Sequence, residues 1–207
     1  MHFYIYNVKN PQIDYSLYHN YFHPNKNQTI IGEATPIYMY WKPAAKRIFE
    51  YNPTIKLIFI LRNPIERAFS NYCMHVKRKK EFLPFIFAIL IEPFRQLLFF
   101  KNQNKFFSYI KRGFYAKQIK KILQHFPQEQ MLFLKTEDLL TNHQETLNKI
   151  FEFLEIPCFD DIEQKIVFSN NYPKIGKFEK KILQNVYKNE IEKLEKLLLW
   201  DITNWKK

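Results

Sequence analysis

The feature that most constrains the fold of this 207-residue chain is a strand-to-helix junction in Lys56–Tyr72, KLIFILRNPIERAFSNY. The run Leu57–Leu61 is wholly apolar and rich in strand formers, which is typical of a strand covered on both faces. Asn63 is a good helix cap, and Pro64 suits the first position of the helix that follows. The junction therefore predicts an α/β chain in which a buried strand leads directly into a helix.

The same junction is chemically suited to hold a phosphate group. The N-terminus of the helix presents free N–H groups and the positive end of a dipole. Arg62 adds a planar set of donors at the end of the strand, and Ser70 adds a hydroxyl if it reaches the same face. From these residues alone, the alternative is an ordinary strand–helix turn with a surface arginine.

The junction resembles the 3′-phosphate-binding motif R-[DN]-P-x-x-R-A-x-S-x-Y of sulfotransferases that use 3′-phosphoadenosine 5′-phosphosulfate (PAPS). The resemblance is closest to the branch with bacterial sulfotransferases and heparan sulfate sulfotransferase domains. Three further blocks match the family in order and extend the resemblance over most of the chain. They are Gly32–Tyr38 (GEATPIY), Arg112–Leu139 (RGFYAKQ, then FPQEQ and MLFLKTEDL) and Glu145–Leu154 (ETLNKIFEFL).

The resemblance implies a P-loop NTPase-like sulfotransferase fold, an α/β architecture with a parallel sheet flanked by helices, in one domain over residues 1–207. It implies an enzyme that moves a sulfuryl group from PAPS to a hydroxyl or amine of a glycan or small molecule. Adenosine 3′,5′-bisphosphate would be the second product. Two alternatives stay open: a non-catalytic remnant that binds the nucleotide or a polyanion, and a nucleic-acid-binding protein favoured only by net charge.

The resemblance also assigns roles to particular residues. In the family, the motif's arginine and serine bind the 3′-phosphate of the donor, and here these are Arg62 and Ser70. Glu33 is the candidate catalytic carboxylate, placed to orient an acceptor, with a structural hydrogen-bonding role as the alternative. Phe168 and Tyr172 fall near a nucleotide-binding loop of relatives and are further candidates, Phe168 for stacking on adenine.

One part of the family pattern has no counterpart in this sequence. The family grips the 5′-phosphosulfate with a loop of the form K-x-G-T-[ST], but the first glycine here is Gly32. The first strand, that loop and the general base of heparan-type enzymes would fall before Met1. We therefore expect a sulfotransferase fold that is incomplete at its N-terminus, with the isolated chain inactive.

Charge and composition bear on the partners. The formal net charge of +12 suits polyanions, namely a nucleotide donor and an acidic glycan acceptor. The lysine runs Lys77–Lys80 and Lys177–Lys181 are interpreted as solvated helix faces, and no nucleic-acid partner is predicted. Ala34 stands where heparan-type enzymes have lysine, which argues against a heparan-like acceptor.

The cysteines and histidines indicate neither a disulfide framework nor a metal site. Cys73 and Cys158 are far apart and lie in no metal-binding pattern, so they are expected to be free thiols in a reducing compartment. The six histidines show no ligand spacing. We expect a cytoplasmic protein that uses no metal.

The apolar stretch Phe82–Phe100 is long enough to suggest a membrane span, but Glu92, Pro93 and Arg95 interrupt it. It is interpreted as helix, turn and helix, and no transmembrane segment is predicted. A peripheral membrane contact stays open as the alternative.

The remaining patterns predict further elements. The helices are expected at Pro43–Tyr51, Tyr115–Phe126, Thr141–Leu154 and Ile182–Leu199, the strands at Thr29–Gly32 and Met131–Leu134, and a loop at Phe168–Lys177.

Overall fold

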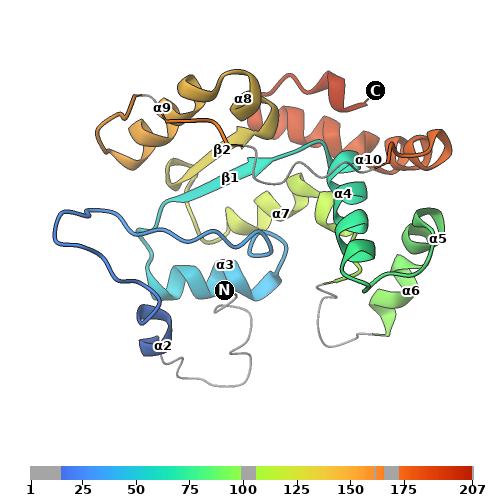
Figure 1. Ribbon diagram of the computed structural model, residues 1–207, viewed down its shortest axis with the longest axis horizontal. Coiled ribbons are helices and arrows are strands. Elements are labelled where there is room, and N and C mark those ends of the chain that lie inside the picture. The colour runs from blue at the N-terminus through green and yellow to red at the C-terminus, as the bar shows by residue number, and fades with distance from the viewer. Residues whose placement is uncertain (1–14, 99–105, 161, 166–172, 207) are drawn as a thin grey trace.

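The computed structural model describes residues 15–98, 106–160, 162–165 and 173–206 (Figure 1). The described helices are α2 (Ser16–His19), α3 (Lys42–Tyr51), α4 (Pro64–Lys77), α5 (Phe85–Leu90), α6 (Glu92–Leu97), α7 (Tyr115–Ile122), α8 (Thr136–Thr141), α9 (His143–Leu154) and α10 (Lys177–Leu198). The short 3-10 helices are η1 (Lys111–Gly113), η2 (Gln128–Gln130) and η3 (Thr203–Lys206), and the strands are β1 (Leu57–Leu61) and β2 (Met131–Lys135).

The sheet of the described residues consists of β1 and β2, which pair in parallel over their full length. Leu57 is opposite Met131, and Leu61 is opposite Lys135. Parallel strands end at the same edge of a sheet, so the chain leaves both strands side by side. The fold is the expected α/β architecture with a parallel sheet flanked by helices.

Helices flank the sheet on both of its sides (Figure 1). Figure 1 shows α3 and α7 on one side, with α8 and α9 on the other and α4 and α10 beside the ends of the strands. The amphipathic α7 buries Ala116 and Ile119 under the sheet, and α10 packs on it through Leu183 and Tyr187, which are fully buried. These contacts hold the N-terminus of α10 close to α4.

The burial of β1 differs from the expectation. We predicted a strand covered on both faces, but Ile60 is 50% exposed and only Leu61 is fully buried. Side chains alternate along a strand, so Phe59 and Leu61 face α7 and enter the core. Ile58 and Ile60 point the other way, where the described residues cover them only in part.

Other expectations are confirmed with shifted boundaries. The segment after Phe82 forms the predicted helix–turn–helix, α5 and α6, and β2, α3, α7 and α9 lie where the patterns placed them. Two expectations are wrong: residues 29–32 form no strand, and α10 begins at Lys177 instead of Ile182. Cys73 and Cys158 are free thiols, as predicted. In the part of the chain that the structure describes, every helix is too short or too polar to cross a bilayer.

Candidate functional site

The junction between β1 and α4 is fixed by hydrogen bonds from three directions. The Asn63 side chain caps α4 and accepts a bond from a backbone N–H of its first turn at 2.9 Å. The Tyr115 hydroxyl donates to the carbonyl oxygen of Arg62 at 3.0 Å. The Thr136 hydroxyl donates to the carbonyl oxygen of Leu61 at 3.1 Å. The backbone that carries Arg62 is therefore held by the first residue of α7 and by the first residue of α8.

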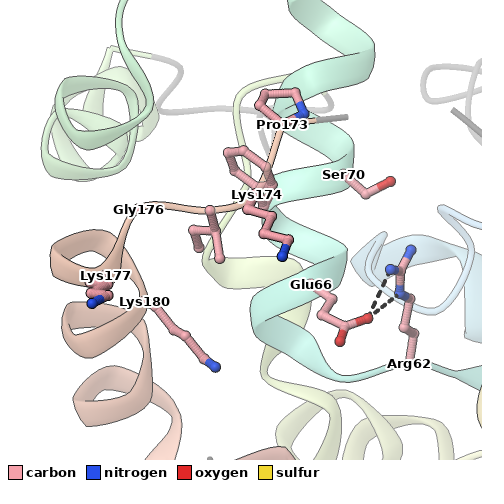
Figure 2. A pocket seen from close by; sticks show the side chains of 10 residues that line it. Arg62, Glu66, Ser70, Pro173, Lys174, Gly176, Lys177 and Lys180 are labelled. Carbon is pink, nitrogen blue, oxygen red and sulfur yellow. Dashed lines mark hydrogen bonds and ion pairs between the residues drawn. The ribbon is translucent and has the colours of Figure 1, made fainter. Parts of the chain in front are cut away.

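A cavity of about 760 Å³ opens beside this junction (Figure 2). Arg62, Glu66 and Ser70 line one wall, and they share a face because they recur at intervals of four residues along α4 and its entry. The opposite wall consists of Pro173–Lys177 and Lys180, from the segment before α10 and from its first turn. The structure thus brings together the two residues to which the resemblance assigned the 3′-phosphate.

The described lining of this cavity carries four cations and one carboxylate. The cations are Arg62, Lys174, Lys177 and Lys180, and the carboxylate is Glu66. In Figure 2 the side chain of Lys174 is directed toward Glu66, whereas Lys177 extends away from α4. The N-terminus of α10 adds the positive end of a 22-residue helix. This electrostatic environment suits a multiply charged anion.

Glu66 occupies the donors of Arg62. Nε and Nη2 of Arg62 both donate to Oε2 of Glu66, at 3.0 and 2.8 Å. The two side chains are 43% and 57% exposed, so water screens the pair. A phosphate oxygen is the same kind of acceptor as this carboxylate oxygen, so it would compete with Glu66 for the same two N–H donors of Arg62.

Arg67 and Gly113, which lie in the blocks that resemble the family, contribute to the packing around the site. Arg67 donates to the carbonyl oxygen of Tyr109, and its guanidinium also lies beside Tyr115 and Tyr187. The Tyr187 ring packs against Gly113, so closely that a Cβ atom added at Gly113 would lie 2.5 Å from the Tyr187 hydroxyl oxygen. The arginine and glycine of these blocks therefore support the packing of α4, α7 and α10.

The remaining candidates lie apart from this cavity or outside the described residues. Glu33 does not line the cavity. Partial burial of its carboxyl group raises its pKa, and a hydrogen bond with Tyr38 opposes that shift. Phe168 and Tyr172 lie outside the described residues. Their roles, and that of Glu33, stay predictions.

Sequence reasoning missed three lysines. Lys177 and Lys180 belong to a run interpreted as a solvated helix face, and Lys174 lies in the segment predicted as a loop. All three line the cavity. The signal that could have found two of them is their spacing of three residues just after Gly176, which places both on one side of a helix's first turn.

Together, the fold and the cavity define an α/β protein with a cavity lined by basic residues at the exit of a parallel strand. The family model described as "Sulfotransferase domain" matches residues 39–196. This chain therefore belongs to the sulfotransferase family.

Individual relatives agree with that membership. Human heparan sulfate glucosamine 3-O-sulfotransferase 3B1 is 32% identical over 130 residues, which are 60% of this chain and 31% of that protein. The human 3A1 enzyme is also 32% identical over 130 residues, 60% of this chain and 30% of that protein. The alignments thus span about a third of the length of these relatives.

A solved structure supports the fold. The crystal structure of a sulfotransferase from Alicyclobacillus acidocaldarius superposes with a TM-score of 0.81 at 24% identity. The superposition covers 94% of this chain and 74% of that one.

Proposed function

We propose that the basic cavity beside α4 binds the 3′-phosphate of PAPS, and that the protein transfers the sulfuryl group of this donor to an acceptor hydroxyl or amine. One observation carries the proposal: Arg62 and Ser70 line a single cavity together with Lys174, Lys177 and Lys180. Family membership makes the phosphate of PAPS the first candidate for the anion that such a cavity would hold.

In the proposed reaction, the acceptor oxygen or nitrogen attacks the sulfur of PAPS in line. A bond to sulfur forms as the bond between sulfur and the bridging phosphate oxygen breaks, and adenosine 3′,5′-bisphosphate leaves with that electron pair. The acceptor's proton must pass to a base. Glu33 is our candidate for the carboxylate that orients the acceptor for this attack, and partial burial raises the pKa of its carboxyl group.

Arg62 and Ser70 act on the far end of the donor from the sulfur. By holding the 3′-phosphate they fix the position of the nucleotide, and the binding free energy is used to orient the reacting sulfuryl group. Their contribution is therefore to positioning. The cations of α10 would strengthen this grip through charge, since the phosphate is a dianion near neutral pH.

For the acceptor, we propose an acidic glycan. The named relatives are heparan sulfate glucosamine 3-O-sulfotransferases, and the net charge of +12 favours a polyanionic acceptor. Ala34, in the block that contains Glu33, argues for a glycan other than heparan sulfate, because heparan-type enzymes carry a lysine there.

The test is calorimetric titration of the chain with adenosine 3′,5′-bisphosphate. We expect binding by the wild type and its abolition by Arg62→Ala, because two charge-assisted hydrogen bonds of roughly 1.5–3 kcal/mol each would be lost. Arg78→Ala is the matched control, since Arg78 caps the other end of α4 and does not line the cavity. Equal affinities of wild type and Arg62→Ala would refute the assignment.

A second titration separates the donor site from a polyanion-binding surface. Adenosine 5′-monophosphate lacks the 3′-phosphate and should bind much more weakly than the bisphosphate. If neither nucleotide binds while a heparin oligosaccharide binds wild type and Arg62→Ala equally, the non-catalytic polyanion-binding alternative is correct.

A further inference from the structure

The segment Phe82–Leu98, here called the α5–α6 hairpin, exposes an unusual amount of apolar surface. It stands at the edge of the molecule in Figure 1. Six of its large apolar side chains are between 54% and 83% exposed: Phe82, Phe87, Leu90, Phe94, Leu97 and Leu98. Single exposed apolar residues are ordinary, but a concentration of this kind marks an interaction surface.

The exposed side chains follow helical spacing on both helices. Phe87 and Leu90 are three residues apart on α5, and Phe94, Leu97 and Leu98 lie at intervals of three and four at the end of α6. Each short helix therefore presents one apolar face to the exterior. The two faces occur on consecutive helices that meet at Ile91.

The opposite side of the hairpin is fixed to the core. Phe85, Ala88 and Ile89 are buried among the main apolar cluster. Glu92 is 1% exposed, and its two oxygens accept hydrogen bonds from the backbone N–H groups of Ile110 at 2.7 Å and Lys111 at 2.9 Å. The hairpin is thus held in place while its outer faces stay exposed.

The charges of this region are segregated by sign. Both carboxylates between Val76 and Leu98 point inward: Glu92 as above, and Glu81, which is 3% exposed and bonds to Arg95 and to the Tyr109 hydroxyl. The four consecutive cations Lys77–Lys80 are exposed on the turn that leads into Phe82. The described exterior of this region therefore combines apolar side chains with positive charge and carries no carboxylate.

We propose that the α5–α6 hairpin and the basic turn Lys77–Lys80 dock on the surface of an anionic lipid bilayer. Apolar side chains on short helices enter the boundary between headgroups and acyl chains, and neighbouring lysines and arginines bind anionic headgroups. The helices are six residues each, so the contact is peripheral. A second copy of the chain fits less well, because it would bring the same cations against each other.

The docking proposal is independent of the nucleotide site. The hairpin does not line the cavity that contains Arg62 and Ser70. Its biological consequence, together with the proposed function, would be to hold the enzyme near acceptors at a membrane. The two proposals can fail separately, because lipid binding and nucleotide binding are measured in different assays.

The experiment is flotation of the full chain with vesicles of phosphatidylcholine alone and of phosphatidylcholine mixed equally with phosphatidylserine. We expect flotation with the mixed vesicles, much less with phosphatidylcholine alone, and a decrease as salt screens the lysines. The double variant Phe94→Ser with Leu98→Ser should reduce the partition coefficient by about tenfold, because both side chains leave the lipid boundary. Lys79→Glu with Lys80→Glu should reduce it on mixed vesicles only.

Matched controls come from exposed positions elsewhere. Leu17 is 65% exposed on α2, and Lys181 and Lys188 are exposed on α10. Leu17→Ser and the pair Lys181→Glu with Lys188→Glu should leave flotation unchanged, and circular dichroism checks that every variant is folded. Absence of flotation by the folded wild type would overturn the proposal. So would equal losses in the hairpin and control variants, or a wild type that dimerises through the hairpin and ignores lipid.

Discussion

Replacing Glu66 with glutamine should make the chain bind adenosine 3′,5′-bisphosphate more tightly. In the structure, Glu66 accepts both hydrogen bonds of the Arg62 fork, at 3.0 and 2.8 Å. A 3′-phosphate must displace this carboxylate before it can use the same donors. The ion pair is present in the free chain and lost in the complex, so its free energy is subtracted from that of binding.

The size of the effect follows from exposure. With side chains 43% and 57% exposed, the pair has the character of a surface ion pair worth about 0.2–1 kcal/mol. Glutamine also removes the repulsion between the carboxylate and the phosphate, which at high dielectric and short range adds up to roughly 1 kcal/mol. We therefore expect Glu66→Gln to tighten binding by between about 1.5-fold and thirtyfold.

The assay is calorimetric titration at fixed ionic strength, with adenosine 5′-monophosphate as the ligand that lacks the 3′-phosphate. The gain should appear with the bisphosphate only. Glu50→Gln is the matched control, because Glu50 forms an exposed i,i+4 pair with Lys46 on α3, away from the cavity. Weaker binding by Glu66→Gln, or an equal gain with both nucleotides, would refute the reasoning. Failure of the wild type to bind would instead contradict the proposed function.

Two further predictions concern stability. Burial, and to a smaller extent nearby cations, lower the pKa of His75 from 6.5 to about 4. The contribution of this neutral histidine to stability is therefore complete above pH 6.5 and is lost as the pH falls toward 4. Thermal melts should show that the free energy of unfolding falls by an amount on the order of 2 kcal/mol between pH 7 and pH 5, and by less in His75→Gln. An equal fall in both proteins would contradict this prediction. Gly113→Ala should lower the free energy of unfolding in urea by about 1–3 kcal/mol, because its Cβ atom would overlap the buried Tyr187 ring. Gly32→Ala serves as the comparison, because a Cβ atom there would meet nothing within 4 Å. Unchanged unfolding of Gly113→Ala would contradict this prediction.

The local parts of the fold could be predicted well from the sequence. The cap at Asn63, the helix that begins at Pro64 and the two strands depend on short runs with strong preferences. The parallel pairing of the strands was expected only from the family resemblance. The start of α10 was misplaced because Lys177–Lys181 is polar, and polarity indicates exposure without distinguishing a helix from a loop. The burial of β1 was misjudged because an apolar run does not reveal how much of each face the neighbouring elements cover.

By itself, the sequence determined the junction of β1 and α4. Arg62 and Ser70 share a face because they are close along one helix and its entry, where spacing alone sets direction. Only the tertiary structure decided what stands opposite them. Leu183 and Tyr187 bury α10 against α4 and α7, and this packing brings Lys180, 118 positions after Arg62, into the same cavity. No local preference encodes that approach, because it results from the shapes of distant apolar surfaces that meet only in the folded chain.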